Sequence, residues 1–168
     1  DRLYVTDEYN FRVQRCTKTI AWTCETFFGV TDEYGSDTTH LGYAYGVEVR
    51  NDVVYIADTS NYRVLKCDLN GECVNFVGEP GVQGPDDYHF FWPTDVAVDS
   101  TGRVFVADEA FHHVQIYNSA GSYVGLRGIT NLPYIPDTIR INSPRGVAIS
   151  NDGGLLVTEN LGRRLIKY

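Results

Sequence analysis

Four acidic residues recur along the chain at a nearly constant interval, and each is followed five positions later by a cationic or imidazole side chain. The acids are Asp7, Asp58, Asp108 and Glu159, spaced by 51, 50 and 51 residues, and the partners are Arg12, Arg63, His113 and Arg164. A carboxylate beside such a group could hold a polar ligand, or it could form a local ion pair. Because each acid ends a short apolar run, where it can cap the amides of a following turn, we expect these eight residues to be structural repeat positions.

The interval of about 50 residues indicates a repeat architecture in which neighbouring units stack. The second unit reads as four short strands over 45–49, 53–57, 63–67 and 73–77. Asn70-Gly71 between the last two runs is a strong hairpin signal, because a tight turn needs positive φ at both central residues. Four short antiparallel strands with longer crossovers are typical of a propeller blade. The sequence therefore predicts an all-β fold, a β-propeller of four-stranded antiparallel blades.

The whole chain, 1–168, is expected to form a single propeller region. Its expected blades cover about 1–30, 43–78, 93–128 and 144–168, joined by linkers 31–42, 79–92 and 129–143. This makes about four blade equivalents, with fourteen strands arranged as three, four, four and three: the first blade lacks its inner strand and the last lacks its outer strand. Unpaired strand edges accept added strands, so we expect a larger propeller or one completed by further copies.

Composition excludes two classes of partner. The formal net charge is −8, and an acidic surface repels phosphate backbones, so no nucleic-acid partner is expected. No run approaches the roughly 18 apolar residues that a membrane helix needs, so no membrane insertion is expected.

The repeated segments resemble a known family. The patterns Asp7-x-x-Asn10-x-Arg12 and Asp58-x-x-Asn61-x-Arg63 resemble the NHL-repeat signature, and segments 93–99 and 144–149 resemble its blade-opening strand. The resemblance covers essentially the whole chain and implies a β-propeller, usually of six blades. The departures from the signature are Phe111 and Gly162 in place of Asn, and His113 in place of Arg. This drift favours a scaffolding role for the motif.

Extracellular members of that family include the peptidylglycine amidating lyase, whose zinc ligands are histidines that follow proline at blade-opening strands. The matching positions here hold Tyr45, Thr94 and Arg145. The resemblance therefore does not carry that zinc site over, and no catalytic set is predicted.

The four cysteines occupy equivalent places in two repeats. Cys16 and Cys67 align on third strands with Tyr117, whereas Cys24 and Cys73 align on fourth strands with Tyr123. Directly opposed residues on antiparallel strands are close enough for a disulfide. We expect the bonds Cys16–Cys24 and Cys67–Cys73, with buried free thiols as the alternative. Disulfides imply an oxidising compartment, hence an extracellular, cell-surface or periplasmic protein.

The linkers carry the remaining candidates for binding. Their aromatic residues either pack between blades or form a surface for protein or glycan contacts; they are Tyr43, Tyr88, Phe90, Phe91, Trp92 and Tyr134. Asp86 and Asp87 are weak Ca²⁺ candidates, because they lack the dense spacing of a dedicated loop, and no other cofactor is expected. His112 and His113 are expected to be adjacent surface residues on one strand.

Two functions follow from these patterns. The first is a non-enzymatic extracellular scaffold that mediates protein association, including self-assembly into a surface or filament structure. The alternative is a fragment of an extracellular propeller lyase or hydrolase whose active site lies in blades outside this sequence.

Overall fold

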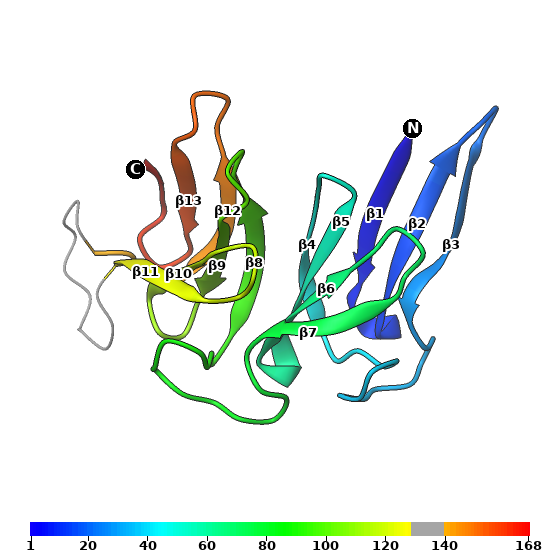
Figure 1. Ribbon diagram of the computed structural model, residues 1–168, viewed down its shortest axis with the longest axis horizontal. Helices are drawn as coiled ribbons and strands as arrows, with labels where there is room; N and C mark the ends of the chain where they lie inside the picture. Colours follow the sequence, from blue (N-terminus) through cyan, green and yellow to red (C-terminus); the bar gives the residue numbers. More distant parts are fainter. Residues whose placement is uncertain (129–139) are drawn as a thin grey trace.

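The computed structural model describes residues 1–128 and 140–168, which form fourteen β-strands in four antiparallel sheets (Figure 1). The first sheet, blade 1, contains β1 (Arg2–Asp7), β2 (Arg12–Lys18) and β3 (Trp22–Gly29). Blade 2 contains β4 (Ala44–Arg50), β5 (Val53–Asp58), β6 (Arg63–Cys67) and β7 (Cys73–Val77). Blade 3 contains β8 (Pro93–Val98), β9 (Val104–Asp108), β10 (His113–Tyr117) and β11 (Tyr123–Gly128). Blade 4 contains β12 (Pro144–Ile149), β13 (Leu155–Glu159) and β14 (Arg164–Lys167). The predicted arrangement of three, four, four and three strands is confirmed.

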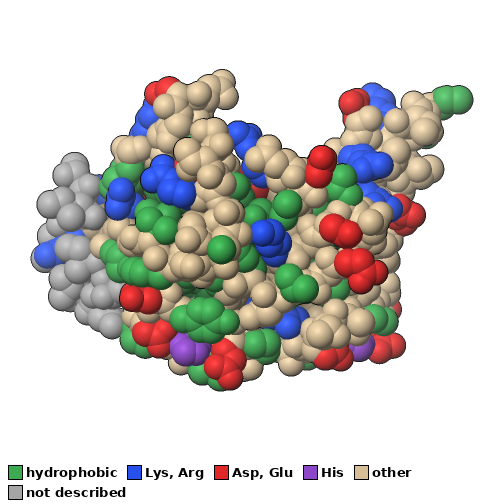
Figure 2. Space-filling model, in the orientation of Figure 1, with side chains coloured by type: hydrophobic (Ala, Val, Ile, Leu, Met, Phe, Trp, Pro, Cys, Tyr) green, Lys and Arg blue, Asp and Glu red, His purple; other side chains and the backbone are tan. Residues whose placement is uncertain are grey.

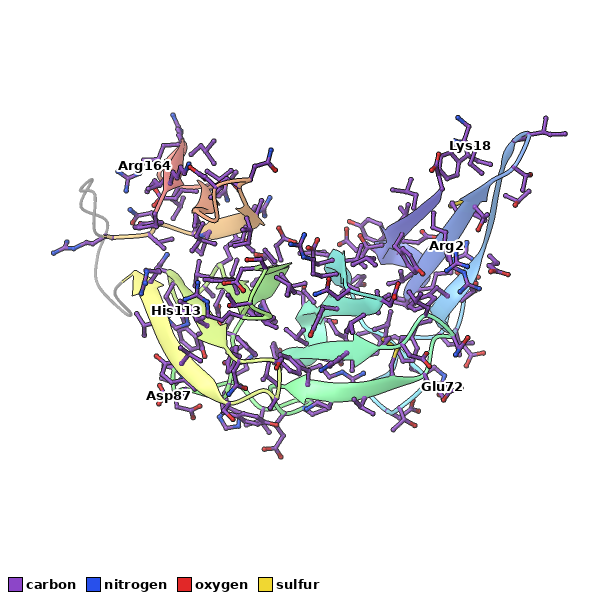
Figure 3. All side chains as sticks on the ribbon, turned by 45° about the horizontal axis from the view of Figure 1, so that its top comes forward. Arg2, Lys18, Glu72, Asp87, His113 and Arg164 are labelled. Carbon is purple, nitrogen blue, oxygen red and sulfur yellow. A yellow bond between two sulfur atoms is a disulfide. The ribbon has the colours of Figure 1, made fainter. Side chains whose placement is uncertain are left out.

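The sheets follow one another around an arc, with blades 1 and 4 at its two ends (Figure 3). Strands are ordered across each sheet as they are along the chain. The opening strands lie side by side, since β4 contacts β8 and β8 contacts β12, while β1 contacts β4. This is the radial stacking of a β-propeller.

The core consists of three clusters, one between each pair of neighbouring sheets. Val54 and Ile56 of β5 pack against Phe27 and Phe28 of blade 1, and comparable clusters join blade 2 to blade 3 and blade 3 to blade 4. Burying such a side chain contributes roughly 1.5–3 kcal/mol, so each sheet depends on its neighbour for stability.

The turn between the second and third strands has the same backbone in every blade. The residue before the third strand is left-handed at Phe11, Tyr62, His112 and Arg163, with φ of 52°, 59°, 59° and 49°. Short 3-10 turns, Glu8–Asn10 and Thr59–Asn61, precede this residue in blades 1 and 2. The expectation that His112 and His113 share a strand was wrong, because His112 is the left-handed residue and β10 begins at His113.

Both expected disulfides are present. Cys16 bonds Cys24 and Cys67 bonds Cys73, each pair with its Cα atoms 4.0 Å apart and directly opposed in the ladder. In blade 3 the same cross-strand pair is Tyr117 and Tyr123, whose rings lie 6.0 Å apart in an edge-to-face arrangement. A covalent staple in two blades is thus replaced by an aromatic contact in the third.

We expect the double substitution Cys67→Ala/Cys73→Ala to lower the free energy of unfolding by about 2.5 kcal/mol, because it frees a short loop in the unfolded chain. Urea unfolding followed by intrinsic fluorescence, with and without reductant, measures this change. Reductant should destabilise the wild type more than the variant, which keeps only one disulfide. An equal shift in both proteins would contradict the prediction.

Candidate functional site

The repeated acid and its partner meet within each of three blades. The Arg Nε atom lies 2.8 Å from the carboxylate in the pairs Asp7–Arg12 and Asp58–Arg63, and 2.7 Å in Glu159–Arg164. The blade 2 pair is buried, with side-chain exposures of 0% and 4%. Burial raises the pKa of Asp58, and Arg63, Asn61 and the Gly42 N–H oppose that rise.

Arg63 also fixes the linker that precedes its own blade. Its guanidinium donates to the carbonyls of Ser36, Asp37 and His40 at 2.7, 3.1 and 3.1 Å. Asp58 accepts the N–H of Gly42 at 2.9 Å. In blade 4, Arg164 likewise donates to the Arg140 carbonyl. These donors are all engaged by the chain itself, as expected for structural repeat positions.

In blade 3, different residues satisfy the repeated acid and hold the preceding linker. Asp108 accepts backbone N–H groups from Phe91, Trp92 and Phe111 at 2.8, 3.1 and 3.2 Å, so its carboxylate is satisfied without an arginine. Gln115 takes over the linker contacts, donating to the carbonyls of Asp86 and His89 at 3.3 and 3.0 Å.

His113 lies in blade 3 (Figure 3) and its side chain is buried, which corrects its assignment to the surface. Its Nε2 atom lies 3.1 Å from Gln115 Nε2, and burial lowers its pKa to about 4. The imidazole is therefore neutral at physiological pH, where an arginine would have been charged. This neutrality fits a site whose acid is already satisfied by backbone amides.

Asp86, one of the two Ca²⁺ candidates in the second linker, is engaged by neighbouring groups of the chain. Asp86 contacts His89 Nδ1 at 2.7 Å and accepts the N–H groups of Tyr88 and His89. The first linker repeats the arrangement, with Asp37 2.8 Å from His40 Nδ1. In both, the carboxylate raises the pKa of the histidine. Acidic side chains with histidines among them line the lower edge in Figure 2. Among the described residues, no three His, Cys, Asp or Glu side chains are grouped to hold a metal ion.

The predicted aromatic surface divides into core and exposed parts. Phe90 is fully buried and belongs to the core between blades 2 and 3, so its assignment to a binding surface was wrong. It occupies the place that buried Leu41 holds in the preceding linker, a correspondence visible in the sequence. Tyr88 is exposed and packs against the His89 ring, whereas Tyr134 lies outside the described residues.

The other aromatic candidates line one cavity of about 250 Å³ between blades 2 and 3, here called the aromatic pocket. Tyr43, Phe91 and Trp92 contribute to its wall together with Tyr45 and Tyr62. The remaining lining residues are polar: Thr59, Ser60 and Gln83. Trp92 is 44% exposed, so its ring is accessible from solvent.

A second cavity of about 530 Å³, here called the axial mouth, lies where the opening strands begin. It is lined by Glu8, Tyr9, Tyr45, Gly46, Thr94, Asp95 and Arg145. The ladders of β4, β8 and β12 shift register at this point, between Ala44 and Val47, Pro93 and Asp95, and Pro144 and Gly146. A bulge re-aims the side chains that it carries, which accounts for the position of Tyr45, Thr94 and Arg145 at the mouth. Tyr45 lines both cavities, so the two lie next to each other.

Asp95 is the site residue that sequence reasoning missed. It stands in blade 3 where blades 2 and 4 have Gly46 and Gly146, and its carboxylate accepts the N–H groups of Val96 and Val147, each at 2.9 Å. Burial raises its pKa to about 6. Aligning the three opening strands would have revealed a lone carboxylate at a glycine position.

No helix in the described ranges is long and apolar enough to cross a bilayer.

Three comparisons agree with this fold. A family model described as NHL repeat matches residues 90–117. Protein brain tumor of Drosophila melanogaster is 33% identical over 143 residues, covering 84% of this chain and 12% of that protein. A probable peptidyl-alpha-hydroxyglycine alpha-amidating lyase of Caenorhabditis elegans is 35% identical over 80 residues, 47% of this chain and 23% of the lyase. A structural genomics protein of Bacteroides thetaiotaomicron superimposes with a TM-score of 0.79 at 20% identity, over 99% of this chain and 44% of that one.

The stacked antiparallel sheets of three and four strands define this molecule as a β-propeller protein. The repeat signature and the matches to it place the chain in the NHL-repeat family. The chain spans less than a quarter of the length of the two curated relatives above.

Proposed function

We propose that this chain is a non-enzymatic propeller scaffold that binds a protein partner through the aromatic pocket. The observation that carries the proposal is the grouping of five aromatic side chains around one cavity. Tyr and Trp are enriched where proteins associate, because each offers a large apolar surface with a polar tip at low entropic cost. A cavity of about 250 Å³ has room for one large side chain of a partner.

The compartment belongs to the same proposal. Disulfides persist in oxidising environments, so the one within blade 1 and the one within blade 2 support an extracellular, cell-surface or periplasmic location.

Association with further copies of the chain is one form of the proposal, and sedimentation velocity tests it. A monomer at all concentrations would leave only a different protein as partner.

An extracellular lyase is the second candidate, because part of the chain is similar to an amidating lyase. The bulged positions of the three opening strands hold Tyr45, Thr94 and Arg145 rather than histidine. A lyase activity of the whole protein would therefore draw its metal ligands from elsewhere. Assay of the full-length protein with α-hydroxyglycine-extended peptides separates the two candidates.

The chain offers a matched test of the aromatic pocket in its two tryptophans. Trp92 lines the pocket and is 44% exposed, whereas Trp22 lies on β3 and is 48% exposed. We expect peptides selected from a phage-displayed random library to carry a large apolar residue and to bind at least tenfold more weakly to Trp92→Ala, because a central aromatic anchor contributes about 2 kcal/mol or more. Trp22→Ala should bind them unchanged. Equal loss in both variants, or no selective enrichment on the wild type, would contradict the proposal.

A further inference from the structure

The axial mouth carries more negative than positive charge at neutral pH. Its lining residues include two carboxylates, Glu8 and Asp95, and one cation, Arg145. The Arg145 Nε lies 3.1 Å from both carboxylate oxygens of Glu109, which neutralises it. Among the described residues, no lysine or arginine forms an ion pair with Asp95. Glu8 is likewise absent from the ion pairs of the described residues, so the mouth presents two carboxylates that no lysine or arginine neutralises.

The position of Asp95 also depends on its neighbours. A Cβ atom built on Gly46 would lie 2.6 Å from the Asp95 Cα and 2.5 Å from its Oδ1, so only glycine fits beside it. Both carboxylate oxygens are anchored by backbone N–H groups, Val96 to Oδ1 and Val147 to Oδ2. Each oxygen retains accepting capacity after one such bond, and Asp95 lines the mouth. The carboxylate is thus held in a fixed orientation at the cavity wall.

Aromatic rings stand beside these carboxylates. Tyr9 and Tyr45 line the mouth together with Glu8, and burial and the Glu8 carboxylate raise the pKa of Tyr45. Ring faces and carboxylates together form the environment that guanidinium and ammonium groups prefer. Tyr45 also lines the aromatic pocket, so this environment lies next to that pocket.

We propose that the axial mouth binds an arginine or lysine side chain of the partner, with Asp95 and Glu8 as counterions, while a neighbouring apolar side chain of the same segment fills the aromatic pocket. This inference rests on the proposed function, whose anchor is the aromatic pocket, and adds the chemical class of the second anchor. A divalent cation is a poorer fit, because three metal-ligating side chains are nowhere grouped within residues 1–128 and 140–168.

The raised pKa of Asp95 supplies an independent signature. The titratable and charged groups around it are Glu48 and Tyr45 on β4, Glu8 beyond β1 and Arg145 on β12. Protonation of Asp95 as the pH falls through about 6 removes one counterion. Binding of a cationic side chain should weaken over this range, whereas binding of a neutral analogue should not.

The test uses acetylated peptide amides that contain tryptophan and arginine separated by short glycine spacers, and matched peptides with citrulline in place of arginine. Citrulline keeps the shape of arginine and removes its charge. We expect the best arginine peptide to bind the wild type about tenfold more tightly than its citrulline match at pH 7.5, as measured by fluorescence anisotropy. The preference should fall to about twofold or less in Asp95→Gly, which restores the residue found in blades 2 and 4. Glu72→Gln, which removes one charge from the loop after β6, should leave it unchanged.

The outcomes distinguish failure of the cationic anchor from failure of the aromatic pocket. Equal affinities for both peptides, with both lost in Trp92→Ala, would overturn the cationic anchor and leave the aromatic pocket standing. A preference for arginine that survives in Asp95→Gly would also overturn it. Failure of every peptide to bind at millimolar concentration would overturn both.

Discussion

Substitution of Arg63 by methionine is expected to lower the free energy of unfolding by about 3–5 kcal/mol, the usual cost of leaving a buried charge without its partner. Asp58 is fully buried and loses the guanidinium 2.8 Å away. Three linker carbonyls lose their donor as well. Urea unfolding monitored by fluorescence and by circular dichroism measures the loss.

Arg12→Met is the matched control, because the equivalent pair in blade 1 has side-chain exposures of 24% and 21%. Water can solvate Asp7 when its partner is removed, so we expect a loss of about 1 kcal/mol or less. If Arg63→Met proves too unstable to purify, Asp58→Asn/Arg63→Met removes both charges and should be less destabilised than the sum of the single changes. Similar losses for Arg12→Met and Arg63→Met would contradict the assigned role of burial.

Acidification is expected to cost about 3 kcal/mol of stability through His113 alone. Its pKa is about 4 in the folded protein and about 6.5 in the unfolded chain. A depressed histidine pKa means that the unfolded state binds protons more readily. The contribution of neutral His113 is therefore complete above pH 6.5, declines as the pH falls, and is lost by about pH 4.

The comparison with His113→Gln isolates this residue, because the carboxylates titrate in both proteins. Relative to the variant, the wild type should lose about 3 kcal/mol of unfolding free energy between pH 7.5 and pH 4. NMR titration provides a second measurement: His113 should stay neutral at pH 5.5, where His40 and His89, whose pKa values are raised, are protonated. A His113 pKa near 6.5 would refute the prediction.

Strand positions were predictable from the sequence because each rests on local patterns that repeat. Asn70-Gly71 fixed one hairpin, and the alignment of Cys16 with Cys67 and of Cys24 with Cys73 gave both disulfides. Side-chain environments were less predictable, since they depend on contacts across 20 or more residues. The replacement of arginine by His113 looked like drift on a surface, yet Gln115, two residues further along β10, assumes its linker contacts. The environments of Phe90 and Asp95 could not be predicted for the same reason, because the neighbouring blade determines whether each side chain is buried.

The dependence of each linker on the following blade has a consequence for how such repeats can be exchanged. Linker 31–42 is held by Arg63 of blade 2, and linker 79–92 by Gln115 of blade 3. A recombination boundary drawn at the start of a blade would separate each linker from the side chain that organises it. The transferable unit is therefore a linker together with the blade after it. Chimeras joined at the ends of outer strands should tolerate shuffling, whereas chimeras joined at Pro93 or Pro144, the first residues of β8 and β12, should not.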